Sequence, residues 1–358
     1  MSAPLPPVSR PASCRWPPLP MLLAACLSAL AGAAEPWALA APYPLVGRVE
    51  AADVSDARLG ALIDVQARFE VIADGFGWSE GPVWLPREQA LVFSDVPANV
   101  AYRWDETSGL TRFLAPSGYT GPAGPAPRQG SNGIKRDSAG RLLICQHGDR
   151  RVARLENSGT FTTLAGRFEG KRFNSPNDLA ITATGVIFFT DPPYGLENLG
   201  VKPDLDFSGV YRLDPDGKVT LVTRELTRPN GIALSPDDRT LYVANSDVKH
   251  PVVIAIDLDA GAQAGPSRPF FDARPLCEKL GIARPLDGAA VDEHGNLWAT
   301  GPGGVVVISP QGDYLGTLLT GRDTANCAFG GPDGRTLFIA ASNLILRVRT
   351  KVRGHFHP

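Results

Sequence analysis

The apolar and polar positions of the chain alternate in a pattern that recurs along most of its length. Six stretches begin with an oxygen-bearing side chain, continue as a short apolar strand, turn through a polar or glycine-containing segment, and enter a second apolar strand. They are EGPVWLPREQALVFSD (80–95), NGIKRDSAGRLLICQ (132–146), NDLAITATGVIFFTD (177–191), NGIALSPDDRTLYVAN (230–245), DGAAVDEHGNLWATG (287–301) and NCAFGGPDGRTLFIAAS (326–342). Self-similarity at a period of roughly 40–55 residues indicates a repeat architecture.

Further strand-like sequence follows each of the first five stretches, so each repeat holds about four strands, as in a β-propeller. The sixth stretch is followed only by LILRVRT, whereas RFEVIADG at 68–75 precedes the first stretch. Pairing this N-terminal strand into the last blade would close the ring and leave no exposed edge. The sequence therefore predicts an all-β fold: a six-bladed β-propeller with four-stranded blades, closed by an N-terminal strand in the last blade. Helices are expected only at 52–64 and 272–281.

The first residue of each repeat is expected to face the central channel, because the first strand of each propeller blade lines it. These residues are Glu80, Asn132, Asn177, Asn230, Asp287 and Asn326. Two carboxylates and four carboxamides, without a thiol or an imidazole, suit a hard cation and favour calcium over magnesium. The alternative is that Asn-Gly and Asp-Gly act only as turn formers. For Asn132 and Asn326 the two interpretations are about equally good.

The N-terminus differs from the repeats. The run MLLAACLSALAGAA follows two arginines and ends in small residues, as a secretory signal peptide does. LAAC at 23–26 also resembles a lipoprotein box with Cys26 as the lipidated residue, and either Met1 or Met21 is the start. The predicted organisation is a signal peptide or lipoprotein leader at 1–34, an N-terminal extension at 35–67 and the propeller at 68–358. The protein is thus expected to be exported, periplasmic or secreted, and lipid-anchored if Cys26 is modified.

Composition excludes several other classes of protein. A hydrophobic content of 43% and a charged content of 20% fit a soluble globular chain. The net charge of −2 gives no attraction to nucleic acid, and the apolar N-terminal run is too short for a membrane span. Cys145 and Cys327 lie in apolar strands and are expected to be buried free thiols. Nothing in the sequence indicates an oligomeric state.

Five motifs resemble those of the senescence marker protein-30/gluconolactonase/luciferin-regenerating family. They are SEGPVW (79–84), SPND (175–178), FTDPPYG (189–195), RPNG (228–231) and LDGAAVDEHGNLW (286–298). The resemblance runs from about Phe69 to the C-terminus. It implies a six-bladed propeller with one catalytic divalent cation in the channel, calcium or zinc.

The resemblance also implies roles for individual residues. Glu80, Asn230 and Asp287 match the metal ligands, and Asn177 lies on or beside the metal. Arg172 is the nearest match to an arginine that contacts substrate in the family.

Candidate catalytic groups follow from this cation. Asp287 is the best candidate for the general base, as both ligand and proton acceptor, with Asp178 and Asp191 as alternatives. Asp191 opens a DPPYG turn, so a purely structural cap is at least as good an explanation for it. His147 either reaches the channel rim, as a base or a substrate ligand, or is a loop histidine that bonds to the backbone.

The expected substrate-binding set is Asn132, His147, Arg172, Asp178 and Asn326, with the loop at 121–131 as a lid above the channel. No Cys–His pairing is present, and the one G-x-S-x-G match, GWSEG at 77–81, leads into an expected strand rather than the strand-to-helix turn of a nucleophile elbow. Both observations argue against covalent acyl-enzyme chemistry.

The sequence thus predicts a metal-dependent hydrolase that opens a sugar lactone, with calcium favoured and zinc or magnesium as alternatives. A phosphotriesterase-like hydrolase with the same metal is one competing hypothesis. A non-catalytic propeller that binds a ligand around a structural calcium is the other.

Overall fold

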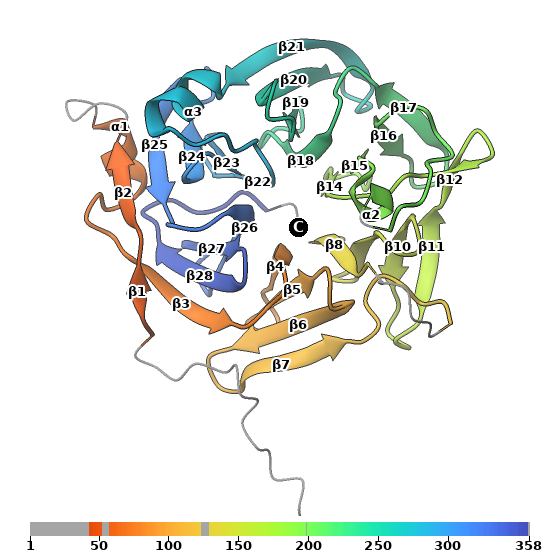
Figure 1. The fold of residues 1–358 in the computed structure, drawn as a ribbon, viewed down its shortest axis with the longest axis horizontal. Coiled ribbons are helices and arrows are strands. Elements are labelled where there is room, and N and C mark those ends of the chain that lie inside the picture. The colour runs from red at the N-terminus through yellow and green to blue at the C-terminus, as the bar shows by residue number, and fades with distance from the viewer. Residues whose placement is uncertain (1–42, 52–56, 123–128, 198, 357–358) are drawn as a thin grey trace, which may run out of the picture. The chain divides into compact units, whose positions relative to one another are not determined.

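The repeating apolar stretches form antiparallel sheets arranged around a central channel (Figure 1). The computed structural model describes residues 43–51, 57–122, 129–197 and 199–356. Over these residues the fold is a six-bladed β-propeller, as predicted. The predicted leader at 1–34, with Cys26, lies outside the described residues, and export of the protein stays a prediction.

The first three blades are four-stranded meanders that run outward from the channel. Blade one is β4 (Ser79–Leu85), β5 (Ala90–Asp95), β6 (Val100–Asp105) and β7 (Gly109–Leu114). Blade two is β8 (Ser131–Arg136), β9 (Leu142–Gln146), β10 (Arg151–Leu155) and β11 (Phe161–Ala165). Blade three is β14 (Leu179–Ile181), β15 (Ile187–Asp191), β16 (Gly209–Leu213) and β17 (Val219–Thr223). A hairpin of β12 (Arg167–Phe168) and β13 (Lys171–Arg172) separates blades two and three.

Blade four repeats this arrangement, whereas blades five and six each carry an additional outer strand. Blade four is β18 (Pro229–Leu234), β19 (Thr240–Asn245), β20 (Val252–Leu258) and β21 (Ala264–Asp272). Blade five is β22 (Ala289–Val291), β23 (Leu297–Gly301), β24 (Gly304–Ile308), β25 (Tyr314–Leu319) and, outermost, β2 (Arg48–Ala51). Blade six is β26 (Thr324–Gly330), β27 (Thr336–Ala341), β28 (Leu344–Arg349), β3 (Phe69–Asp74) and, outermost, β1 (Leu45–Val46).

The ring closes in blade six, where β3 pairs with β28 as predicted. The segment before β3 was expected only as an extension, and it contributes to two blades: β1 pairs with β3, and β2 pairs with β25. Gly47 joins these two short strands with φ +67, and a Cβ there would lie 2.3 Å from Phe69 Cδ2. Blades five and six are thus also held together across their outer edges.

Helices are short and lie between strands. The segment expected at 52–64 contains α1 (Arg58–Leu62), with 52–56 outside the described residues. The segment expected at 272–281 forms α3 (Arg274–Leu280), which ends at Gly281 in the left-handed conformation, a common helix C-terminus. A further helix, α2 (Tyr194–Glu197), follows the DPP turn of blade three. Within the described ranges, no helix has the length and apolar character needed to cross a membrane.

The hydrophobic core lies between neighbouring blades and leaves the channel free. Each of six buried clusters combines residues of two adjacent blades, such as Val83 with Ile144 between blades one and two, or Trp298 with Phe329 between blades five and six. Cys145 and Cys327 belong to these clusters as buried free thiols, which confirms that prediction.

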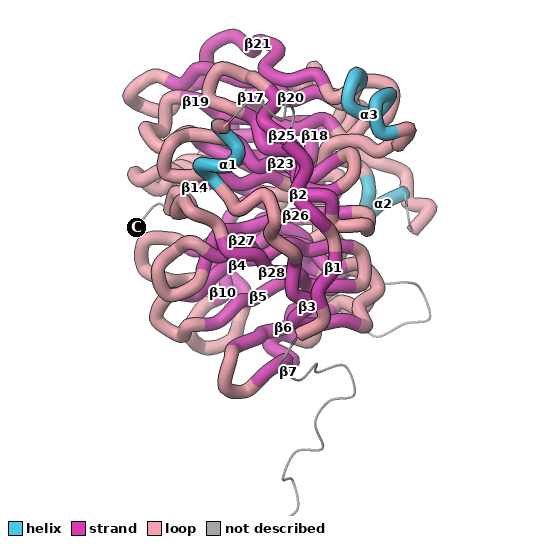
Figure 2. The backbone as a smooth tube through the Cα atoms, turned by 90° about the vertical axis from the view of Figure 1, so that its left-hand side faces the viewer, coloured by secondary structure: helices cyan, strands magenta, loops and turns pink. Residues whose placement is uncertain are grey.

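The two mouths of the channel differ. One mouth opens on the face that carries α2 and α3 (Figure 2). At the opposite face the C-terminal tail crosses the axis, where His355 N donates to Val291 O and Gly354 pairs with Asp292 (Figures 1 and 2). A cavity of about 160 Å³ beside this tail is lined mainly by apolar side chains.

Candidate functional site

A cavity of about 450 Å³ occupies the channel mouth on the α2 and α3 face. Residues from five of the six blades line it. Six of the nine site residues expected from the sequence are among them: Glu80, Asn132, His147, Asn177, Asn230 and Asp287. Glu80 and Asp287, which are 207 positions apart in sequence (287 − 80), are thereby brought to one site.

The glycine that follows four of the six ring residues explains how the blades approach each other here. A Cβ on Gly231 would lie 2.1 Å from Asp287 O, and one on Gly81 would lie 2.0 Å from Asn132 O. Gly231 N also donates to Asp287 O at 2.9 Å. Only glycine permits this contact, so the recurring Xaa-Gly pairs are packing sites between blades as well as turns.

Hydroxyl side chains at the ends of the second strands reinforce the ring. Ser94 Oγ donates to Asn132 O at 2.9 Å, and Thr190 Oγ1 donates to Asn230 O at 2.7 Å. Thr300 Oγ1 donates to Ala325 O at 2.8 Å, next to the last ring residue. Each bond holds the backbone of the next blade at its ring residue or directly before it, and thereby fixes the strand that carries the ring side chain.

Several buried polar atoms in the cavity lack a partner among the described residues. They are Asn132 Oδ1, Asn177 Oδ1, Asp287 Oδ1 and both ring nitrogens of His147. Unpaired buried polar atoms are costly, so such a group indicates a ligand or ordered solvent. Three of these atoms are oxygens of predicted ring residues, and the donor set therefore fits a hard cation. Among the described residues no group of three His, Cys, Asp or Glu side chains could hold a metal ion. The ring residues on the cavity wall include only two acids, Glu80 and Asp287, and the others are asparagines.

Burial perturbs the acids of the ring. Burial raises the pKa of Glu80 to about 7, and the nearby Asp178 carboxylate adds to the effect. Burial also raises the pKa of Asp287 well above its ordinary range, with Glu80 as the next cause. Two carboxyls that face each other in an enclosed site hold a proton unless a positive charge is present.

Asp178 and Asn326 lie beneath the cavity rather than on its wall. Asn326 Nδ2 donates to Glu80 Oε2 at 3.2 Å and to Asp178 Oδ2 at 3.3 Å, while Asn326 Oδ1 accepts a bond from Cys327 N. Neither residue is part of the cavity lining. The contacts give both residues a supporting position behind Glu80, away from the wall that a substrate would touch.

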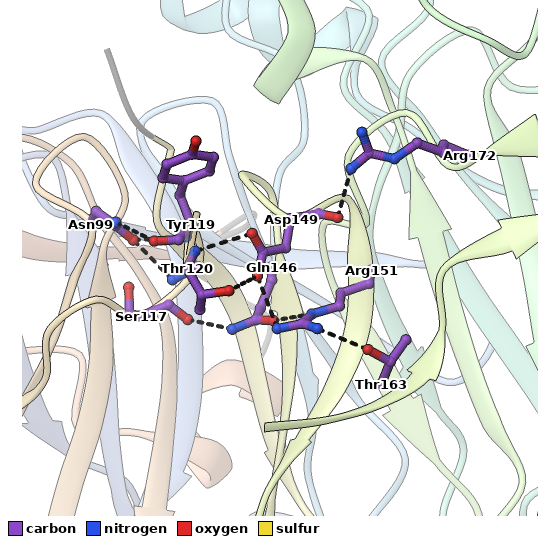
Figure 3. A network of polar contacts seen from close by, with 10 residues as sticks. Asn99, Ser117, Tyr119, Thr120, Gln146, Asp149, Arg151, Thr163 and Arg172 are labelled. Atoms are coloured by element: carbon purple, nitrogen blue, oxygen red, sulfur yellow. Dashed lines mark hydrogen bonds and ion pairs between the residues drawn. The ribbon is translucent and has the colours of Figure 1, made fainter. Parts of the chain in front are cut away.

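Arg172 is not brought to the cavity. It lies in the hairpin between blades two and three, where Arg172 Nη2 donates to Asp149 O at 3.0 Å (Figure 3). Asp191, one of the two alternative bases, is not part of the cavity lining either. Its two carboxylate oxygens accept bonds from Asn174 N and Ser175 N, each at 2.8 Å. Asp191 therefore caps the backbone of this turn, as the structural interpretation expected. Burial raises the pKa of Asp191 to about 7.

A sequence profile of the SMP-30/gluconolactonase/LRE-like region matches residues 78–343. That range contains every ring residue. The chain belongs to the SMP-30/gluconolactonase/LRE-like family.

Similar proteins within the family include several named for lactones. A gluconolactonase from Zymomonas mobilis is 41% identical over 83% of this chain and 85% of its own length. A pentonolactonase from Haloferax volcanii is 29% identical over 74% of this chain and 81% of its own length. A solved gluconolactonase from Xanthomonas campestris superposes with a TM-score of 0.73 at 31% identity, over 86% of this chain and 98% of that one.

Several residues that line the cavity of this SMP-30/gluconolactonase/LRE-like protein were not among the site residues expected from the sequence. They are Trp78, Gln129, Tyr194, Arg228 and Arg284, among others. A signal for three of them was present: Trp78, Arg228 and Arg284 stand two or three positions before Glu80, Asn230 and Asp287. The residues that precede the ring residues in three blades thus also belong to the cavity wall.

A network of polar contacts fixes residues 117–120, which lie between blades one and two, against Asn99, Gln146 and Asp149 (Figure 3). Asn99 Oδ1 accepts bonds from Gly118 N and Tyr119 N, at 2.9 and 3.0 Å. Thr120 donates to Asp149 through both its hydroxyl and its backbone N–H. The predicted lid at 121–131 includes residues 123–128, which lie outside the described residues, so a lid stays a prediction.

Proposed function

We propose that this protein hydrolyses a sugar lactone and uses one divalent cation held by oxygen ligands in the channel. The observation that carries the proposal is a group of buried oxygens without a donor, Asn132 Oδ1, Asn177 Oδ1 and Asp287 Oδ1, on the wall of one cavity. The lactonases and gluconolactonases among the relatives support the same class of reaction.

Glu80, Asn177, Asn230 and Asp287 would hold the cation. Calcium is expected because neutral amide oxygens and two carboxylates match its preference for oxygen ligands and loose geometry, with zinc or magnesium as alternatives. The two acids would balance the charge of a dication. When bound, the cation supplies Lewis-acid chemistry that polarises a carbonyl group.

Asp287 is proposed as the general base. Its Oδ1 is buried and has no donor among the described residues. The Asp287 residue as a whole is partly exposed, and it lines the cavity. A carboxylate oxygen in that position accepts the proton of a water molecule that attacks the lactone carbonyl. The ring-opened product then carries a hydroxyl and a carboxylate.

His147 and Asn132 are proposed to bind sugar hydroxyls. His147 is only 3% exposed, and burial lowers its pKa to about 4, so the imidazole is neutral near pH 7. A neutral imidazole offers one donor and one acceptor. These two groups and the free amide oxygen of Asn132 provide complementary contacts for a polyhydroxylated ring.

The test is hydrolysis of glucono-δ-lactone by the purified protein, followed by titration of released acid at constant pH. We expect activity that is lost after metal removal with EDTA and restored by calcium. Full activity after verified metal removal would contradict the cation. Faster hydrolysis of a phosphotriester than of any lactone would favour the phosphotriesterase hypothesis. Calcium binding without any hydrolysis would favour a non-catalytic propeller.

A further inference from the structure

Two arginines at the mouth of the cavity lie on aromatic rings. The Arg284 guanidinium lies over Trp78 at 5.5 Å from the ring centre, and that of Arg228 lies over Tyr194 at 5.1 Å. All four side chains line the cavity. An arginine held on an aromatic face presents its N–H groups in a fixed orientation.

The charge of Arg228 is already matched. Its Nη1 and Nη2 donate to the two carboxylate oxygens of Glu197, at 2.9 and 2.8 Å. Asp247 also lines the cavity, and its carboxylate accepts bonds from Thr227 Oγ1 and Lys249 N. Arg228 is therefore a structural part of the wall, with its amino groups engaged.

Arg284 differs, because its ion pair involves Nε and leaves the two terminal amino groups of the guanidinium without an ion pair among the described residues. Among the described residues its charged partner is Asp323, whose Oδ1 lies 3.3 Å from Arg284 Nε. The side chain of Asp323 is 56% exposed, so this ion pair is weakened by solvent. Arg284 Nη1 and Nη2 form no hydrogen bond or ion pair within the part of the chain that the structure describes, and they remain able to bind an anion.

The acids that face Arg284 across the cavity do not neutralise it in the loaded enzyme. Glu80 and Asp287 balance the dication of the proposed function, so the nearest counter-charge left to Arg284 is the exposed carboxylate of Asp323. Arginine binds phosphate, sulfonate and carboxylate groups through paired N–H donors.

We propose that Arg284 is a specificity-determining residue that binds an anionic substituent, so that the preferred substrate is a sugar lactone carrying a phosphate, sulfonate or carboxylate group. This inference rests on the proposed function, since it assigns the substrate class of the same cavity. Trp78 positions the guanidinium, and Asp323 competes with the substrate anion for it.

The experiment compares kcat/KM for glucono-δ-lactone with kcat/KM for the same lactone phosphorylated on its exocyclic hydroxyl. We expect the wild type to prefer the phosphorylated lactone. Arg284→Gln should lower kcat/KM for the phosphorylated lactone by about 10- to 100-fold, the range of a hydrogen bond to a charged group. The neutral lactone should change by less than about 3-fold, because it makes no charged contact with Arg284.

Further variants distinguish this role from a structural one. Arg284→Lys should retain part of the preference, and Asp323→Asn should increase it by freeing the guanidinium. Added salt should lower the rate on the phosphorylated lactone more than on the neutral one. Arg268→Gln, which removes an exposed arginine paired with Asp257 on the outer edge of blade four, controls for net charge.

Two failures are distinguishable. If both lactones are hydrolysed alike and Arg284→Gln affects them equally, this inference is wrong while the lactonase proposal stands. If neither lactone is hydrolysed, the lactonase proposal fails, and calorimetry with the phosphorylated aldonate still measures the anion site. Loss of that binding in Arg284→Gln supports the site, and unchanged binding overturns it.

Discussion

Asn326 of the last blade donates through Nδ2 to Glu80 of the first blade, at 3.2 Å and across 246 positions of sequence. The same amide nitrogen donates to Asp178 at 3.3 Å. The amide cannot turn freely, because its oxygen accepts a bond from Cys327 N at 2.9 Å. The point where the ring closes is therefore also the point that orients two of the site's buried carboxyls.

Replacing Asn326 by leucine should destabilise the protein, because two buried carboxyls lose a donor and no solvent replaces it. We expect the free energy of unfolding to fall by about 2–4 kcal/mol, as for lost hydrogen bonds to charged groups. Urea denaturation in EDTA measures this. Asn343→Ala, at an exposed position of the same blade, should change stability by less than about 0.5 kcal/mol. Equal effects of the two substitutions would show that the amide has no orienting role.

A methyl group at Gly231 should disrupt the ring from the backbone side. The added Cβ would lie 2.1 Å from Asp287 O, and neither backbone can yield without moving the Asp287 side chain. We expect Gly231→Ala to lose about 3 kcal/mol or more of stability and to weaken cation binding. Gly60→Ala is the matched control: it lies in α1 with open space around its Cα, so stability should stay equal or rise by up to about 1 kcal/mol. Unchanged calcium affinity in Gly231→Ala would contradict the proposed link between packing and ligand position.

The ring could be predicted because its signal is a frame that recurs six times. Equivalent positions in four blades are occupied by Glu80, Asn177, Asn230 and Asp287. In a propeller the innermost strands all face the central channel, so residues at equivalent positions lie around one site. Residues outside that frame could not be placed in the same way. Arg172 precedes the third ring residue by only five positions, yet its hairpin carries it toward Asp149.

The outer strands of blades five and six could not be predicted from the sequence either. Leu45–Val46 and Arg48–Ala51 are too short to give an alternating pattern, and they are strands because edges of blades five and six were available to pair with them. Arg284 was missed for a related reason. Its position at the cavity mouth depends on the turn after α3, and its significance depends on which neighbours leave its amino groups free.

Substitutions of Asp287 and Asp191 should have different effects, because the first is proposed to act in catalysis and the second has a structural role. Asp287→Asn should abolish the calcium-dependent rise in melting temperature and lower kcat by about 100- to 10,000-fold, because it removes both a ligand charge and the proposed base. Asp191→Asn should instead lower stability and leave calcium binding intact, since Asp191 caps Asn174 N and Ser175 N away from the cavity. Thermal unfolding with and without calcium, together with lactone kinetics, measures both. Loss of calcium binding in the Asp191 variant alone would reverse these assignments.

His147 should make the stability of the protein fall in acid. Its pKa is lowered by burial from 6.5 to about 4, so between these values the unfolded chain binds more protons at this position than the folded one. The neutral imidazole therefore contributes stability that is fully present above pH 6.5 and is lost as the pH falls toward 4. The full shift corresponds to about 3 kcal/mol at most.

The comparison of wild type with His147→Gln isolates this contribution, because the buried acids Glu80 and Asp191 are present in both proteins and give slopes of the opposite sign. Urea denaturation in EDTA at a series of pH values should show the wild type losing more stability than the variant between pH 6.5 and pH 4. Parallel curves would mean that His147 is hydrated in the cavity and keeps its ordinary pKa. It would then be protonated at mildly acidic pH, and its proposed role as a neutral partner for sugar hydroxyls would be restricted to higher pH.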